Sequence, residues 1–146
     1  MTQQGRTKTK IKLVDTNVIL RYLIEDGGEK AEQAKKLMKR VETGEEFIEI
    51  SALVTAEIIW TLEKVYKIPR ADVVARLLDM FMLTGVKSKE KRVITRALNV
   101  YGTMNVDFTD CYLVFLSKES DVPVYSFDRK DFTRLAKKFD FQWETP

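Results

Sequence analysis

Ile-Lys-Leu-Val-Asp-Thr-Asn, residues 11–17, is the segment from which the fold of this chain can first be predicted. Its first four residues predict a short buried strand. The three polar residues that follow can begin a helix, because short polar side chains cap helix N-termini. In an open α/β sheet, ligands bind beyond the carboxyl ends of parallel strands. Asp15, which stands at such an end, is therefore a candidate site residue.

A second apolar run ends in the same way near the other end of the chain. Residues 124–127 read Val-Tyr-Ser-Phe and are followed by Asp128. Carboxylates at two strand ends can converge, and converging carboxylates repel one another unless a cation neutralises them. Hard oxygen ligands suit Mg²⁺ or Mn²⁺. With Glu57 and Asp110 as further acidic candidates at element boundaries, the sequence indicates metal-dependent phosphate chemistry.

Strand-like and helix-like patterns alternate along the chain. Strands are expected at residues 10–14, 47–50 and 124–127, with an edge strand at 139–143. Helical spacing covers residues 18–23, 29–41, a segment ending at 65, 69–81, 88–101, 110–119 and 132–138. Short strands separated by helices predict an α/β fold, a three-layer α/β/α sandwich around a central, mainly parallel sheet. We expect one domain at residues 10–146 after a disordered tail, residues 1–9.

The composition excludes several kinds of active site. The chain of 146 residues has no histidine and one cysteine, Cys111. A Ser-His-Asp or Cys-His triad, a zinc site built from cysteine and histidine, and an intramolecular disulfide are therefore excluded. Acid–base or metal chemistry in this protein must rely on carboxylates.

The charge pattern leaves two interpretations open. The net charge is +3, and basic residues cluster at 35–40, 87–96 and 129–138. Such clusters can follow a phosphate backbone, or they can be solvated helix faces. The apolar stretches are too short to span a bilayer, and no signal-type segment precedes the first strand. We expect a soluble cytoplasmic protein with no membrane association.

Each acidic candidate also has a purely structural interpretation. Asp15 and Asp110 can be helix caps, because capping by aspartate is common. Glu57 can be an ordinary surface residue of its helix. Asp128 and Asp131 can belong to a plain turn. Each signal alone is weak, so the argument depends on their combination.

Four segments together resemble the PIN domain family. They read KLVDTNVIL (residues 12–20), SALVTAE (51–57), VDFTDCYL (106–113) and VYSFDRKDF (124–132). The last resembles the form Thr-Phe-Asp-x-x-Asp-Phe, with Ser126 in place of threonine. The order of the segments matches the family, and the length and single-domain form resemble the VapC-type toxins of toxin–antitoxin pairs.

The resemblance implies a set of site residues. Asp15, Glu57, Asp110 and Asp128 would be the catalytic acids that bind Mg²⁺ or Mn²⁺. Asn17 and Ser126 would orient carboxylates or water, with Thr16 and Asp107 as further polar neighbours. Asp107 is an extra acid near Asp110, and whether it binds metal stays open. We favour Asp110 because its separation from Asp128 is the one associated with the family.

The same resemblance implies a function and partners. The expected activity is a metal-dependent endoribonuclease that leaves 5′-phosphate and 3′-hydroxyl ends on RNA, with a protein antitoxin as partner. The alternative is a non-cleaving module that binds RNA or protein. A phosphoaspartate enzyme of the haloacid-dehalogenase or receiver type ranks last, because Asn17 stands where the former needs a second aspartate. Apolar residues on adjacent helices suggest a homodimer face, or else core packing: Ile58, Ile59, Trp60, Leu62, Tyr66 and Phe81.

Overall fold

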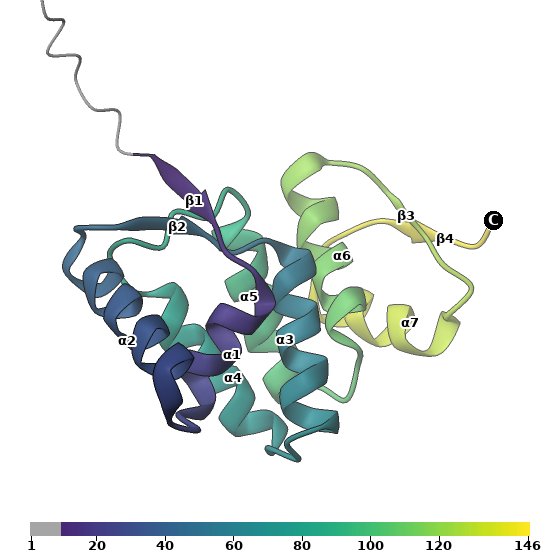
Figure 1. Ribbon diagram of the computed structural model, residues 1–146. Helices are drawn as coiled ribbons and strands as arrows, with labels where there is room; N and C mark the ends of the chain where they lie inside the picture. The colour runs from purple at the N-terminus through teal and green to yellow at the C-terminus, as the bar shows by residue number, and fades with distance from the viewer. Residues whose placement is uncertain (1–9) are drawn as a thin grey trace, which may run out of the picture.

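The computed structural model describes residues 10–146, and the predicted tail, residues 1–9, lies outside this range. Strands and helices alternate much as the sequence predicts (Figure 1). The strands are β1 (Ile11–Leu13), β2 (Phe47–Glu49), β3 (Val124–Tyr125) and β4 (Trp143–Glu144). The helices are α1 (Thr16–Ile24), α2 (Gly28–Thr43), α3 (Ala52–Lys64), α4 (Arg70–Phe81), α5 (Lys91–Thr103), α6 (Phe108–Ser120) and α7 (Arg129–Lys138).

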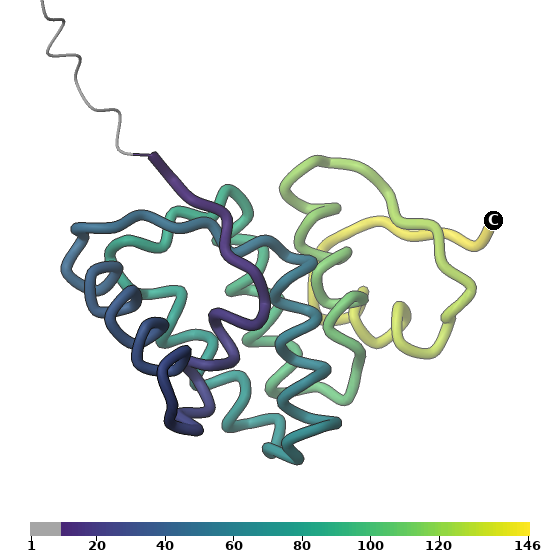
Figure 2. The backbone as a smooth tube through the Cα atoms, in the orientation of Figure 1, coloured from purple at the N-terminus to yellow at the C-terminus, as the bar shows by residue number. Residues whose placement is uncertain are grey.

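All strand pairing within residues 10–146 is parallel, which agrees with the prediction. β1 pairs with β2, with Ile11 opposite Phe47, and Val86 adds a single parallel bridge to Ile48 on β2. After α7 the chain turns back so that β4 lies beside β3 (Figure 2). The predicted single central sheet is not shown, because the strands of the described part form two separate sheets of two strands each. Most of the structure is helical.

α2 illustrates how the sequence sets the helix limits. Its buried side chains recur at helical spacing: Ala31, Ala34, Met38 and Val41. The helix ends at Gly44, which adopts a left-handed conformation with φ of 80° and donates its N–H to the carbonyls of Arg40 and Val41. Glycine reaches this conformation without a steric penalty. Among residues 10–146, no helix combines the length and apolar character needed to cross a bilayer.

One hydrophobic cluster joins the helices to β2, and it corrects the suggested dimer face. Ile58, Ile59, Leu62 and Phe81 are buried within this cluster. Of the six residues suggested for a dimer face, only Trp60 and Tyr66 are exposed, by 60% and 46%. The helices α3, α4 and α5 pack on one another, so their apolar stripes are used inside the monomer.

β1 is more exposed than predicted. The side chains of Ile11 and Leu13 are 52% and 82% exposed, and only Val14, just after the strand, is buried. In the described residues β1 pairs with β2 alone, and β3 belongs to the other sheet. Within residues 10–146, no neighbouring strand therefore covers the free edge of β1. The apolar residues 11–14 correctly predict a strand, but the prediction that this strand is buried is wrong.

The last strand begins later than predicted. Residues 139–142 precede β4, and two of them, Phe139 and Phe141, pack their rings on aromatic residues of the helices. Phe139 meets Phe115 with ring centroids 5.3 Å apart, and Phe141 meets Phe132 at 6.1 Å. These contacts attach the C-terminal segment to α6 and α7, and they leave only Trp143 and Glu144 to pair with β3.

Candidate metal site

Three carboxylates from the ends of two helices come together. Asp110 lies in the first turn of α6, while Asp128 precedes α7 and Asp131 lies in its first turn. Each offers one carboxylate oxygen, and these oxygens all lie within 4.8 Å of one another. The three carboxylates thus bring the start of α6 close to the turn between β3 and α7.

Local hydrogen bonds fix the turn that carries Asp128. Its backbone N–H donates to the Ser126 hydroxyl oxygen at 3.0 Å. Its Oδ1 atom accepts the backbone N–H of Asp131 at 2.9 Å, which makes Asp128 the N-cap of α7. The cap occupies one oxygen, and a carboxylate can accept about four hydrogen bonds or metal contacts through its two oxygens. Capping and metal binding are therefore compatible in this residue.

The pKa of Asp110 reports the crowding of negative charge. Burial is the largest cause that raises this pKa, and the charges of Asp107, Asp128 and Asp131 raise it further, to about 6. A carboxylate in a low-dielectric site beside three other carboxylates is costly to ionise. A bound cation would remove this cost, because it neutralises the charges that oppose ionisation.

Asp107 occupies the N-cap position of α6, which begins at Phe108, earlier than the predicted residue 110. Its backbone is extended, as in ordinary caps, but its side chain accepts no capping hydrogen bond. Asp107 and Asp110 are three residues apart in the sequence. Because the helix starts at Phe108, both lie at the same helix end, where side chains at this spacing are neighbours. This explains why Asp107 is the first charge that raises the Asp110 pKa.

A hydrogen bond to a further acidic residue, Glu57, links α1 to α3. The hydroxyl of Thr16, a buried residue, donates to Glu57 Oε2 at 2.8 Å. Asp15 stands at the N-cap of α1, but its side chain makes no capping hydrogen bond. By contrast, Ser51 at the start of α3 accepts the N–H of Val54 at 3.1 Å. The Asp15 carboxylate is exposed and is not used as a cap, so it is available to another partner.

Two of the four acidic residues that the sequence predicts for the site also lie in the three-acid group of the structure. Asp110 and Asp128 were named from the sequence and lie in the three-acid group; Asp15 and Glu57 lie outside it. The sequence predicts Asp131 as a turn residue, and the motif Asp-x-x-Asp is the signal that could have placed it beside Asp128. It also faces Arg134, whose Nη1 lies 3.5 Å from its Oδ1. Asn17 lines a pocket between α1 and α2 instead.

The donor set suits a hard divalent cation. All three groups are carboxylates, which Mg²⁺ and Mn²⁺ favour. Oxygens on opposite sides of a Mg²⁺ ion, bound at about 2.1 Å each, are about 4.2 Å apart. One oxygen of each carboxylate lies within 4.8 Å of the other two, a spacing of the same order. Asp110, Asp128 and Asp131 can therefore hold such an ion.

Comparison with known proteins supports the resemblance over most of the chain. The family model that matches is described as the PIN domain, and it covers residues 12–138. All four motif segments fall within this range. A comparison with curated proteins finds no matching relative. Since the match extends over far more than half of its length, the chain belongs to the PIN domain family.

Proposed function

We propose that this protein is a metal-dependent endoribonuclease. PIN domains are generally metal-dependent nucleases that act on RNA or DNA. The observation that carries the proposal for this chain is the convergence of Asp110, Asp128 and Asp131 within 4.8 Å. An acidic cluster with a partly buried member has little structural value without a cation, because mutual repulsion opposes folding.

The proposed division of roles follows from the contacts. Asp110 and Asp128 would hold Mg²⁺ or Mn²⁺, while Asp15 and Glu57 would complete the site from the α1–α3 side. Asp131 shares its charge with Arg134, so its contribution would be weaker. The cation would activate the attacking water and neutralise the leaving 3′-oxygen. Thr16 would hold the Glu57 carboxylate in place through its 2.8 Å hydrogen bond.

Single-stranded or looped RNA is the proposed substrate. Two exposed cations, Arg129 and Lys130, lie between Asp128 and Asp131 in the sequence, at the start of α7. Cations beside an acidic site can hold the flanking phosphates while the scissile phosphate meets the metal. An acidic pocket needs an exposed backbone, which unpaired RNA offers more readily than a duplex.

The test is a cleavage assay with RNA and Mn²⁺, with and without EDTA. We expect the wild type to cut RNA only with the metal. Asp128→Asn and Asp110→Asn should each lower the rate at least about a hundredfold, since each removes a charged ligand. Asp15→Asn tests the other half of the site in the same assay, and we expect a similar loss.

Asp121→Asn is the matched control. Asp121 ends α6 in a left-handed conformation with φ of 53°, which asparagine also tolerates, and it is exposed. The Asp121→Asn variant should cleave RNA at the same rate as the wild type. Cleavage that survives EDTA or the Asp128 substitution would reject the proposal. Intact RNA together with salt-dependent binding would instead favour the non-cleaving binding module.

A role as the toxin of a VapC-type pair is the finer proposal. Its support is the match to the PIN domain over residues 12–138, together with the resemblance of the four motif segments. Expression of the wild type should arrest bacterial growth, whereas Asp128→Asn should not. Co-expression with the product of a neighbouring gene should restore growth if that product is the antitoxin. Normal growth with abundant, nuclease-active protein would contradict the toxin role.

A homodimer is proposed on the exposed side of α3. Leu53 and Trp60 are 80% and 60% exposed and lie seven residues apart, so they share one helix face with Glu57. Exposed aromatic residues are common at interfaces. Light scattering after size exclusion should give twice the mass of 17.0 kDa for the wild type and a monomer for Trp60→Glu. A monomeric wild type at micromolar concentration would rule the dimer out.

A further inference from the structure

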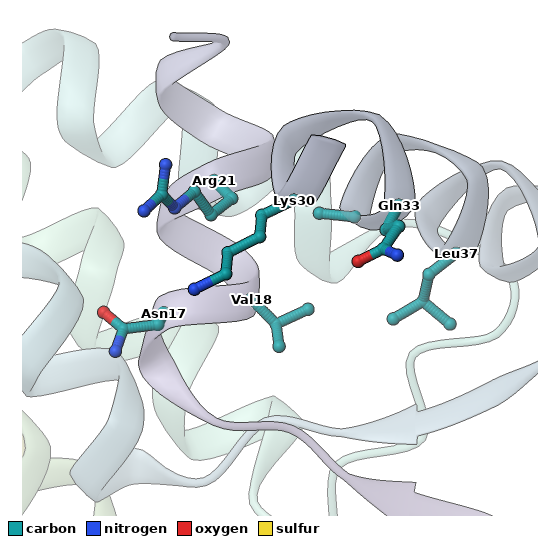
Figure 3. A pocket seen from close by; sticks show the side chains of 7 residues that line it. Asn17, Val18, Arg21, Lys30, Gln33 and Leu37 are labelled. Atoms are coloured by element: carbon teal, nitrogen blue, oxygen red, sulfur yellow. The ribbon is translucent and has the colours of Figure 1, made fainter. Parts of the chain in front are cut away.

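The face between α1 and α2 carries a pocket of about 480 Å³ that the proposed metal chemistry does not use. Figure 3 shows the lining side chains along the two helices, with the Lys30 amino group directed toward Asn17. This volume falls in the range of about 300–1,000 Å³ that small-ligand sites occupy. It can hold one nucleotide unit.

The two walls of the pocket are faces of α1 and α2, and each face carries one cationic and one carboxamide side chain. On α1, Asn17 and Arg21 lie one turn apart. On α2, Lys30, Gln33 and Leu37 follow one another at helical spacing. The rim is thus cationic and carboxamide-bearing. The floor is apolar, because Ala34 is buried and Val18 and Leu37 are half-buried.

Lys30 is the cation with the most freedom to bind an anion. The Nη1 atom of Arg21 already lies 3.2 Å from Asp26. Lys30 forms no ion pair with any residue in the range 10–146. Its ammonium group is exposed and faces the pocket. A phosphate would give it the counter-charge that the protein does not supply.

The pocket begins at the helix end that carries Asp15. Asn17, which lines the pocket, follows the N-cap Asp15 and Thr16 at the start of α1, and Thr16 donates a hydrogen bond to Glu57. If Asp15 and Glu57 complete the site as proposed, a strand whose scissile phosphate meets them would have its neighbouring nucleotide at this helix.

We propose that the α1–α2 pocket binds the nucleotide of single-stranded RNA next to the scissile bond. Lys30 and Arg21 hold its phosphate, Gln33 donates or accepts a hydrogen bond at the base edge, and Val18 and Leu37 contact the base. This subsite rests on the proposed nuclease function, because that function supplies the RNA. It adds the positioning of the strand, which the carboxylates alone cannot provide.

The test measures RNA binding without cleavage. A fluorescein-labelled single-stranded RNA is titrated with full-length protein in EDTA, and anisotropy gives Kd at several salt concentrations. Lys30→Glu should raise Kd about tenfold and reduce the salt slope by about one, since one phosphate contact is lost. Lys30→Gln should give a smaller loss of about threefold. Circular dichroism checks that both variants are folded.

Lys36→Glu is the control, because it makes the same charge change on the exposed part of the same helix, away from the pocket. It should raise Kd less than about twofold. Equal losses in the two charge-reversal variants would show diffuse attraction and overturn the subsite, as would wild-type binding by Lys30→Glu. Binding is measured without metal, so a failure of cleavage in the Mn²⁺ assay is a separate result.

Discussion

At the level of single residues, the two oxygens of Asp128 leave it able to take a second partner besides the helix that it caps. Its Oδ1 caps α7 through the N–H of Asp131. One of its oxygens lies within 4.8 Å of carboxylate oxygens of Asp110 and Asp131. Asp15 and Asp107 differ from it, because they stand at helix starts without capping them. Neither carboxylate is therefore engaged in a capping hydrogen bond.

The hydrogen bond from the Thr16 hydroxyl to Glu57 can be tested with a single substitution. Thr16→Val keeps the shape but removes the donor to Glu57, so we expect RNA cleavage to fall about tenfold or more. Thr55→Val is the matched control, because that buried threonine donates its hydroxyl to the carbonyl of Ser51 rather than to a carboxylate. Thr16→Ser should restore the rate. Equal losses in the two valine variants would point to a general structural effect.

Asp110 should make the metal-free protein less stable as the pH rises. Its folded-state pKa of about 6 exceeds the ordinary value of 3.8, so the folded state holds its proton more tightly. The stabilisation is fully present below about pH 3.8 and is lost as the pH rises through 6. After allowance for solvent screening of this half-exposed group, we estimate a loss of about 1–2 kcal/mol.

The measurement is urea unfolding of wild type and Asp110→Asn in EDTA. At pH 7.5 the asparagine variant should be more stable by about 1–2 kcal/mol, and the difference should vanish toward pH 4. The same variant should lose nuclease activity. A variant less stable than the wild type at pH 7.5 would show that Asp110 is not strained by its neighbours.

At the scale of elements, the short segment around Gly85 extends the β1–β2 sheet. The carbonyl of Gly85 accepts the N–H of Ile48 at 2.9 Å, and the N–H of Lys87 donates to the carbonyl of Ile48 at 2.8 Å. The bridge between Val86 and Ile48 thus places this segment beside β2 without forming a further strand. The sequence signal, Gly-Val, is too brief to predict it, because the bridge depends on a partner far away in the sequence.

Gly85→Ala should disrupt this element. An added Cβ atom would lie 2.1 Å from the carbonyl oxygen of Glu46 and 2.7 Å from that of Val41, and backbone cannot yield as a side chain can. We expect a loss of at least about 2 kcal/mol of unfolding free energy, measured in urea. Gly102→Ala is the control: its new methyl would meet only the Val74 side chain, and alanine favours the helix. Similar values for the two variants would contradict the steric argument.

At the scale of the whole molecule, the site depends on segments from distant parts of the chain. The start of α1 lies beside α3 in Figure 1, where Thr16 reaches Glu57. Asp110 and Asp128 meet where α6 packs on α7. A cation that binds this group binds only the folded state. Metal affinity and global stability are therefore linked.

Mn²⁺ should raise the melting temperature of the wild type. At a concentration 100 times its Kd, a ligand specific for the folded state adds about 2.7 kcal/mol, or about 5–10 °C for a domain of this size. Asp121→Asn should show the same rise. The double variant Asp110→Asn, Asp128→Asn should show none. An equal rise in the double variant would place the bound cation elsewhere.

Local patterns were enough to predict most helices and the residues of the acidic motifs. The apolar spacing in α2 and the glycine at its end act within a few residues, so they can be read directly. Asp110 and Asp128 were identifiable because each belongs to a motif around a helix start. The meeting of Asp15 and Glu57 with these two acids stays a prediction.

The order of elements, the absence of histidine chemistry and the acidic motifs can all be read from the residues alone. The packing of the folded chain is needed to show that Asp131 joins Asp110 and Asp128, that β1 is exposed, and that Ile58 and Phe81 are core residues. Caps and helical spacing are local interactions between near neighbours in the chain. Burial, strand partners and clusters of charge depend on which distant segments pack together, and no local pattern contains that information.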